Sequence, residues 1–177
     1  MPVLLIHPAR NFSGELRTFM KTFTQIHVAI SLIAIFAGLV VMVGLLTRNR
    51  LDRWTGLFLL TTVATSVTGF FFPFHGFTPA IGVGILSMLL LTLAIVARYP
   101  CHLLGAWRWI YVLTAMVSLY LNVFVLIVQA FQKLPFLKAL APTQSEPPFL
   151  VIQALALLLF VVLTIVAAIR FRVASAA

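Results

Sequence analysis

The chain has 177 residues, of which 63% are hydrophobic and 8% are charged. Its mean hydropathy is +1.16, whereas a typical soluble domain is about one quarter charged. Because so few charged residues cannot cover the surface of a water-soluble globule, the composition excludes an ordinary soluble domain. The net charge of +9 comes from basic residues that flank apolar segments in twos and threes. This pattern indicates topogenic charge and attraction to anionic lipid headgroups, and it argues against a nucleic-acid-binding face.

The N-terminal segment, residues 1–23, precedes the first long apolar run and is amphipathic. Ser13 is a candidate helix N-cap, and one apolar face follows it at helical spacing. That face consists of Leu16, Phe19, Met20 and Phe23. The pattern predicts a short helix over 13–23 that lies in the membrane interface.

Five apolar stretches then approach the roughly 20 residues that a helix needs to cross a bilayer core about 30 Å thick. We expect membrane-spanning helices over 24–47, 54–72, 79–97, 109–131 and 148–169. The third opens with Thr78 and Pro79, a cap residue followed by proline in the first turn. The sequence therefore predicts an all-α integral membrane protein, a bundle of about five transmembrane helices. They form a single domain over 24–169, followed by a short tail, 170–177.

The connections between these helices differ in charge. Those after the first and third helices, together with the C-terminus, hold seven Lys and Arg residues, against two on the opposite side. The positive-inside rule therefore predicts a cytoplasmic C-terminus, although the basic residues of the N-terminal segment narrow the difference to seven against five. The overall pattern is typical of short polytopic proteins of bacterial inner membranes.

The longest connection runs from Gln132 to Pro147 and is unusually apolar for an exposed loop. We expect it to dip into the membrane interface or to cover the end of the bundle. It is also the natural docking surface for other membrane subunits.

Polar residues within apolar helices mark the faces that avoid lipid. On the fourth helix five of them fall within roughly 80° of arc: Tyr111, Thr114, Ser118, Asn122 and Gln129. The second helix carries Thr61, Thr65 and Thr68 on one face, with Thr62 and Ser66 beside it, and the first carries a strip of small or polar residues, His27, Ser31, Ala34 and Gly38. Two interpretations stay open: interhelical packing with hydroxyls bonded to backbone carbonyls, or the lining of a polar cavity.

Two histidines define a candidate cofactor site. His27 lies about one turn inside the first helix, His75 lies in the link between the second and third, and the topology places both on one side of the membrane. Neutral imidazoles bind haem iron, copper or zinc, so this pair is a candidate b-type haem or metal site. Asn122 and Gln129 are candidate supporting groups. The alternative for each histidine is a hydrogen-bonding role.

Four polar residues, Gln129 among them, fall at the level of these histidines and are candidates to complete a metal or quinone headgroup site: Gln129, Gln132, Glu146 and Gln153.

Missing motifs narrow the choice of function. No acidic or basic residue lies deep in a predicted helix, which argues against a proton-driven carrier. The sequence has no phosphate loop, dinucleotide fingerprint, common hydrolase motif or covalent haem-attachment motif. Cys101 is the single cysteine, so no intrachain disulfide forms.

Three functions remain. The first, which the small extramembrane part favours, is a non-enzymatic membrane component or accessory or assembly subunit. The second is a b-type haem, metal or quinone-binding redox protein that uses His27 and His75. The third is a channel or facilitator for a small neutral solute, lined by Thr61, Thr65, Thr68 and Asn122.

Overall fold

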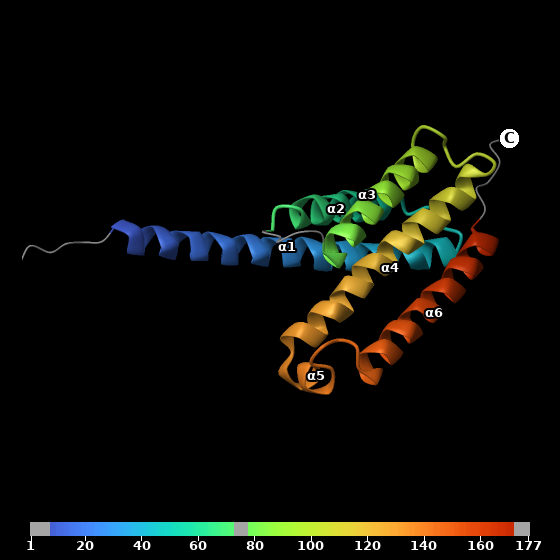
Figure 1. The fold of residues 1–177 in the computed structure, drawn as a ribbon. Helices are drawn as coiled ribbons and strands as arrows, with labels where there is room; N and C mark the ends of the chain where they lie inside the picture. Colours follow the sequence, from blue (N-terminus) through green and yellow to red (C-terminus); the bar gives the residue numbers. More distant parts are fainter. Residues whose placement is uncertain (1–7, 73–77, 172–177) are drawn as a thin grey trace, which may run out of the picture.

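The computed structural model of the protein describes residues 8–72 and 78–171, with side chains from residue 14 onward (Figure 1). Every regular element in these ranges is a helix, which confirms the predicted all-α membrane bundle. The helices are α1 (Pro8–Leu46), α2 (Asp52–Gly69), α3 (Pro79–Arg98), α4 (Trp107–Lys133), α5 (Pro135–Leu140) and α6 (Pro147–Arg170).

Four of the described helices are long and apolar enough to cross a membrane: α1 (as Gly14–Leu46), α3, α4 and α6. The fifth long helix, α2, has 18 residues and begins with Asp52 and Arg53. Six Thr and Ser side chains lower its hydropathy further. Its polar composition is tolerated because it packs against both α1 and α3, where hydroxyl groups find partners inside the bundle.

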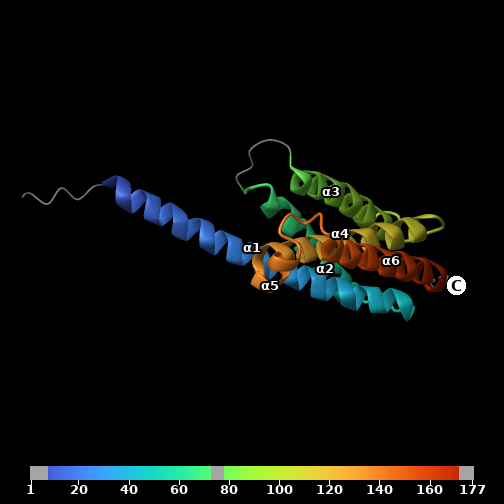
Figure 2. The ribbon, with the colours of Figure 1, turned by 60° about the horizontal axis from the view of Figure 1, so that its bottom comes forward.

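The bundle is organised around α4, which packs against α1, α3, α5 and α6. Figures 1 and 2 show the α1–α2 connection, the α3–α4 connection and the end of α6 at one end of the bundle. We call this the basic end, because its described residues include Arg48, Arg50, Arg53, Arg98, Arg108 and Arg170. The other end, where α5 lies, is the α5 end. The alternation of helix directions matches the predicted topology.

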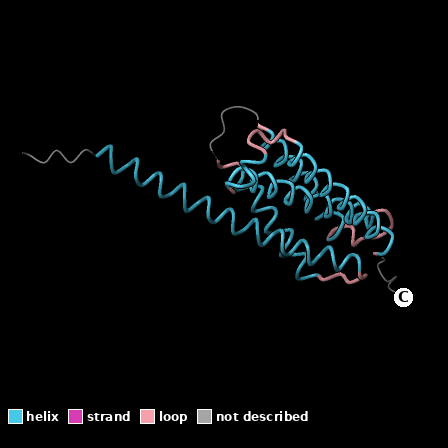
Figure 3. The backbone as a smooth tube through the Cα atoms, turned by 90° about the horizontal axis from the view of Figure 1, so that it is seen from below, coloured by secondary structure: helices cyan, strands magenta, loops and turns pink. Residues whose placement is uncertain are grey.

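The first helix corrects one prediction. A separate helix capped by Ser13 was expected over 13–23, but α1 runs without a break from Pro8 to Leu46, so Ser13 lies inside it. Three threonine hydroxyls in this stretch donate to the carbonyl four residues earlier: Thr18 to Gly14, Thr22 to Thr18 and Thr24 to Met20. Because these polar groups are satisfied locally, nothing in the stretch interrupts the helix. Figure 3 shows the N-terminal half of α1 continuing beyond the other helices.

Smaller corrections concern the other helix ends. α2 ends at Gly69, three residues before its predicted end, because Phe70 to Phe72 form a turn bonded to the carbonyls of Val67, Thr68 and Gly69. Thr78 is the N-cap of α3 as expected, but its side chain makes no capping hydrogen bond. α4 gains two residues at each end, and α5 was not predicted as a helix.

The core is densely packed around α4. Its largest fully buried side chains include Tyr111, Met116 and Leu119 of α4, Phe58 of α2 and Leu91 of α3. The predicted small-residue strip of α1 makes this approach possible: Ala34 is fully buried, and a Cβ built on Gly38 would lie 2.5 Å from Leu119 Cδ1. The strip is therefore a helix-packing surface.

Candidate functional site

A polar seam runs between α2 and α4 inside the bundle. At the part of the seam nearer the basic end, the Tyr111 hydroxyl donates to Thr55 Oγ1 at 3.4 Å. One level further along, Asn122 Nδ2 donates to Thr62 Oγ1 at 3.3 Å. Thr55, Thr62 and Tyr111 are fully buried. The predicted polar face of α4 therefore does point into the bundle, where Tyr111 and Asn122 hydrogen-bond to α2.

The face predicted for α2 is rotated in the structure. Thr55, Thr62 and Ser66 are the buried hydroxyl residues, whereas Thr61, Thr65 and Thr68 are half-buried. Thr61 Oγ1 donates to the Leu57 carbonyl at 2.7 Å, and Thr68 Oγ1 donates to the Ala64 carbonyl at 2.7 Å. On α4, Thr114 Oγ1 likewise donates to the Ile110 carbonyl at 2.7 Å. Hydroxyls that bond their own helix in this way serve packing, since they no longer offer a proton to a ligand.

One hydroxyl group on each of the helices α2 and α4 keeps unused hydrogen-bonding capacity. Ser118 Oγ and Thr65 Oγ1 are buried and have no hydrogen-bond partner among the described residues. Buried polar groups normally have a partner in the protein or an ordered water. These two oxygen atoms are therefore buried polar groups that the contacts between the described helices leave without a partner.

The sequence interpretation missed an ionic network at the basic end. Arg98, the last residue of α3, is buried, and its Nη2 donates to the Arg50 carbonyl at 3.1 Å and to the Asp52 carboxylate. Its guanidinium lies over the Tyr111 ring, 5.1 Å from the centroid. Thr55 Oγ1 donates to the same Arg50 carbonyl at 3.3 Å. The network joins α2, α3 and α4 at one point and connects directly to the polar seam.

A signal for this network was present in the sequence. Asp52 is the single acidic residue among the described residues of the basic end, and the topology places the start of α2 beside the end of α3. An isolated acid among arginines at one membrane boundary predicts an ion pair, although it does not show which arginine is buried.

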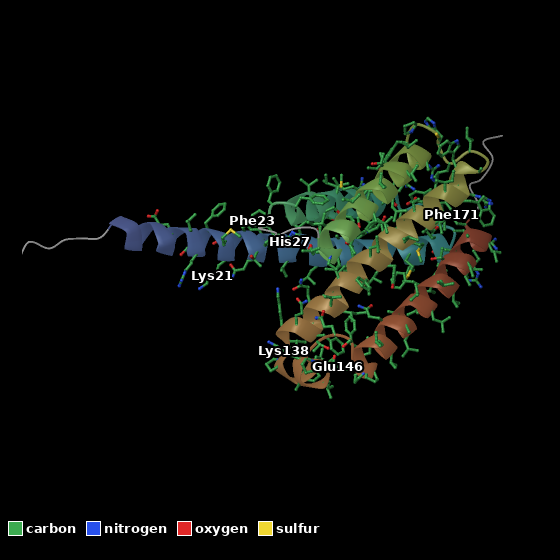
Figure 4. All side chains as sticks on the ribbon, in the orientation of Figure 1. Lys21, Phe23, His27, Lys138, Glu146 and Phe171 are labelled. Atoms are coloured by element: carbon green, nitrogen blue, oxygen red, sulfur yellow. The ribbon has the colours of Figure 1, made fainter. Side chains whose placement is uncertain are left out.

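His27 lies on α1 and faces the end of α2 (Figure 4). Its Nδ1 is 2.8 Å from Thr68 Oγ1, and its ring stands edge-on to Phe72 with the centroids 5.1 Å apart. Thr68 Oγ1 also lies 2.7 Å from the Ala64 carbonyl. In the arrangement in which the Thr68 hydroxyl donates to that carbonyl, it accepts from Nδ1–H of a neutral His27, and Nε2 is the unprotonated nitrogen.

The partners expected around His27 are not brought together by the described residues. His75 lies outside them, so a pair of histidine ligands stays a prediction. Asn122 bonds Thr62 in the seam, and Gln129 is half-buried on α4. Within the described ranges no group of three or more His, Cys, Asp or Glu side chains is placed to hold a metal ion.

The other three members of the expected headgroup site make separate contacts. Gln132 Nε2 donates to Gln144 Oε1 at 3.4 Å, and Gln153 Nε2 donates to the Phe124 carbonyl at 3.3 Å. Glu146 serves its own turn between α5 and α6 (Figure 4). One carboxylate oxygen accepts from Thr143 N at 3.1 Å and from the Thr143 hydroxyl at 2.9 Å, and the other accepts from Ser145 N at 3.1 Å. These residues build the connection between α4 and α6.

We expect Glu146→Gln to loosen this turn. Desolvation acts to raise the pKa of Glu146, but the hydrogen bonds from Thr143 and Ser145 outweigh it and hold the pKa below its ordinary value. A lowered folded-state pKa means that the carboxylate stabilises the turn fully above the unfolded value, about 4.3, and loses this effect as the pH falls through the lowered value. Protection from hydrogen exchange, taken relative to the intrinsic rate of each amide at that pH, should therefore fall for the non-proline residues of 141–147 in Glu146→Gln at pH 7, and in the wild type only under acid. Unchanged exchange in the variant would contradict the assignment.

Comparison of the chain with protein-family models, with curated proteins and with solved structures finds no match. The class that the fold defines is a helical protein with apolar helices suited to a membrane.

Proposed function

We propose that this protein is a non-enzymatic membrane subunit whose bundle presents a preformed docking surface for a partner subunit at the α5 end. The observation that carries this proposal is an apolar patch on and beside α5. The α5 patch consists of Leu134, Phe136 and Leu140, which are 45%, 66% and 54% exposed. Three large apolar side chains that turn away from the bundle, on a connection outside the spans, need a cover.

The connection that carries the patch is braced from inside, as a docking surface requires. Phe131 and Phe149 pack edge to face with ring centroids 5.3 Å apart, and Ala141 is fully buried beside them. Gln144 Nε2 donates to the Val128 carbonyl at 3.3 Å. A surface held in one conformation loses little entropy when it binds, which favours affinity.

The interior favours this proposal over a solute pathway. Of the residues expected to line a pore, Thr61 and Thr68 bond to their own helix and Asn122 bonds to the neighbouring one. Thr65 Oγ1 alone among these four has no partner within the described residues. Tyr111, Phe58 and Met116 are fully buried in the core. The polar seam therefore supports a rigid bundle, and rigidity is what a scaffold subunit needs.

The proposed setting is the bacterial inner membrane with the basic end toward the cytoplasm. The described residues of that end include six arginines, and Arg108 Nη1 donates to the Phe171 carbonyl there. Exposed arginines such as Arg48 and Arg53 are suited to contact anionic lipid headgroups. A protease-protection assay on a C-terminal tag should show the tag on the cytoplasmic side.

The docking proposal is tested by Phe136→Ser combined with Leu140→Ser. We expect a photo-cross-linker at position 136 of the otherwise wild-type chain to capture one partner protein in native membranes, and the double variant to lose that partner on purification. Leu104→Ser is the matched control, because Leu104 is 68% exposed but lies at the basic end. Retention of the partner by the double variant, or cross-linking at 136 to lipid alone, would reject the proposal.

A second candidate function, cofactor binding, is favoured by the fixed ring of His27. A histidine whose Nδ1–H is held by a hydrogen bond presents Nε2 in one orientation, as metal-binding histidines do. The test is the visible spectrum and metal content of protein purified in mild detergent. A Soret band that disappears in both His27→Ala and His75→Ala would establish a haem site, and a colourless, metal-free sample would reject it.

A further inference from the structure

The N-terminal half of α1 is too long and too exposed to be explained by the bundle alone. The helix has 39 residues, about 58 Å at about 1.5 Å per residue, whereas the bilayer core is about 30 Å thick. Figures 2 and 3 show its N-terminal part continuing away from all other helices. If the uninterrupted apolar run from Thr24 marks the membrane boundary, the stretch before it lies outside the core.

This projecting stretch nevertheless carries large apolar side chains. Leu16 and Phe19 are 49% and 65% exposed, and Phe19 stacks on Phe23 with ring centroids 6.3 Å apart. Lipid tails cover exposed apolar residues within the membrane, but they do not reach a straight helix outside it. Something else must cover Leu16 and Phe19.

The spacing of these apolar residues indicates which kind of structure packs against them. Beginning at Leu16, apolar residues recur at alternating intervals of three and four, which is the a and d pattern of a coiled coil. We call this set the α1 seam: Leu16, Phe19, Phe23, Ile26, Ile30 and Ile33. From Leu16 to Ile33 this repeat of 3.5 residues covers about two and a half heptads, and it is the spacing with which one helix packs against another.

The α1 seam has exposed residues both in the projecting stretch before Thr24 and at the membrane level after it. Ile26 and Ile33, at the membrane level, are 52% and 47% exposed. Phe23 reaches Phe72 of the same chain, with ring centroids 5.1 Å apart, so the seam borders the face that α1 turns to α2. Phe23 and Ile30 are half-buried. A second helix would therefore approach from the exposed side of the seam, which Leu16, Phe19, Ile26 and Ile33 form.

The charges of the stretch favour a second copy of the chain as that helix. With Leu16 as an a position, Arg17 and Lys21 occupy b and f, on the side away from the seam. The positions that flank the seam are Glu15, Met20, Thr22, His27 and Ala29, and of these five residues Glu15 alone carries a formal charge at pH 7. In a parallel pair Glu15 faces Met20 of the other copy, so no like charges meet. Two copies inserted in one membrane with the same orientation are necessarily parallel.

We infer that α1 packs along the α1 seam against α1 of a second copy, in parallel, from the membrane level into the aqueous phase. This contact is independent of the α5 patch, since the two surfaces involve different helices. Either proposal can therefore fail while the other stands.

The test uses the full chain in liposomes. In a Cys101→Ser background, single cysteines are placed at each position from 15 to 27, and oxidative cross-linking to a covalent dimer is measured. We expect maxima at positions 16, 19, 23 and 26, and minima at 17 and 21. Cross-linking without a period of 3.5 residues would overturn the inference.

A matched pair of charge variants provides the second measurement. Phe19→Glu places a carboxylate in the seam, whereas Thr18→Glu places it at an exposed c position on the same helix turn. Single-molecule photobleaching at increasing lipid dilution should show dimer dissociation at least about tenfold stronger for Phe19→Glu, with Thr18→Glu like the wild type. A wild type that is a single copy at every density, or equal effects of both variants, would overturn the inference. So would quenching of a probe at position 19 by brominated lipid, since the bilayer would then cover the seam.

Discussion

Asp52→Ala is expected to cost about 2–3 kcal/mol of the free energy of unfolding. The variant leaves the guanidinium of Arg98 without its counter-charge, and the Arg98 side chain is only 3% exposed. The Arg50 carbonyl and the Tyr111 ring remain as partners, and neither carries a full charge. We place the cost toward the low end for a broken buried pair, because the Asp52 side chain is 73% exposed and water reaches it. Equilibrium unfolding in mixed micelles measures this cost.

A double-mutant cycle with Arg98→Met separates the ion pair from other effects of Asp52. Asp52 also lies in the first turn of α2, where a carboxylate stabilises the helix N-terminus by a few tenths of a kcal/mol. Arg98→Met removes the buried charge and keeps most of its apolar volume, so we expect it to cost less than Asp52→Ala. In that background Asp52→Ala should cost only the small helix-end effect. Additive costs would show that the ion pair does not stabilise the bundle.

The sequence predicted the helical architecture because membrane helices are specified by strong local signals. Length, apolar composition and flanking charges define α3, α4 and α6 to within two residues at each end. The rotation of the polar face of α2 could not be predicted in this way. Thr61, Thr62, Thr65, Ser66 and Thr68 spread over roughly 160° of the helix circumference at 100° per residue, so only the neighbours decide which of them turn inward.

The candidate site was less predictable for a related reason. The polar stripe of α4 pointed correctly to the interior, but the partners of each residue depend on helix register, which no local pattern specifies. Thus Asn122 was expected near His27 and instead bonds Thr62. Ser13 was expected to begin a helix because cap residues act locally, but α1 continues through it. A cap residue inside a strong helical run does not force a boundary.

Gly38→Ala is expected to destabilise the bundle by about 1–3 kcal/mol through overpacking. The added methyl would lie 2.5 Å from Leu119 Cδ1 and 2.9 Å from two atoms of the Phe58 ring. Leu119 and Phe58 are themselves almost fully buried, so they have little room to move. α1 must then separate from α2 and α4, which weakens contacts along the packed face.

Gly56→Ala is the matched control for this substitution. Gly56 also lies within a helix, but its nearest neighbour to an added Cβ is the Tyr99 hydroxyl at 3.9 Å. Alanine is favoured over glycine in a helix interior by up to about 1 kcal/mol, so Gly56→Ala should leave stability unchanged or raise it. In a Leu119→Ala background, which removes the closest clashing atom, Gly38→Ala should cost clearly less than in the wild type. Equal costs in both backgrounds would mean that the close approach of α1 and α4 at Gly38 does not limit packing, and that another contact determines how near the two helices lie.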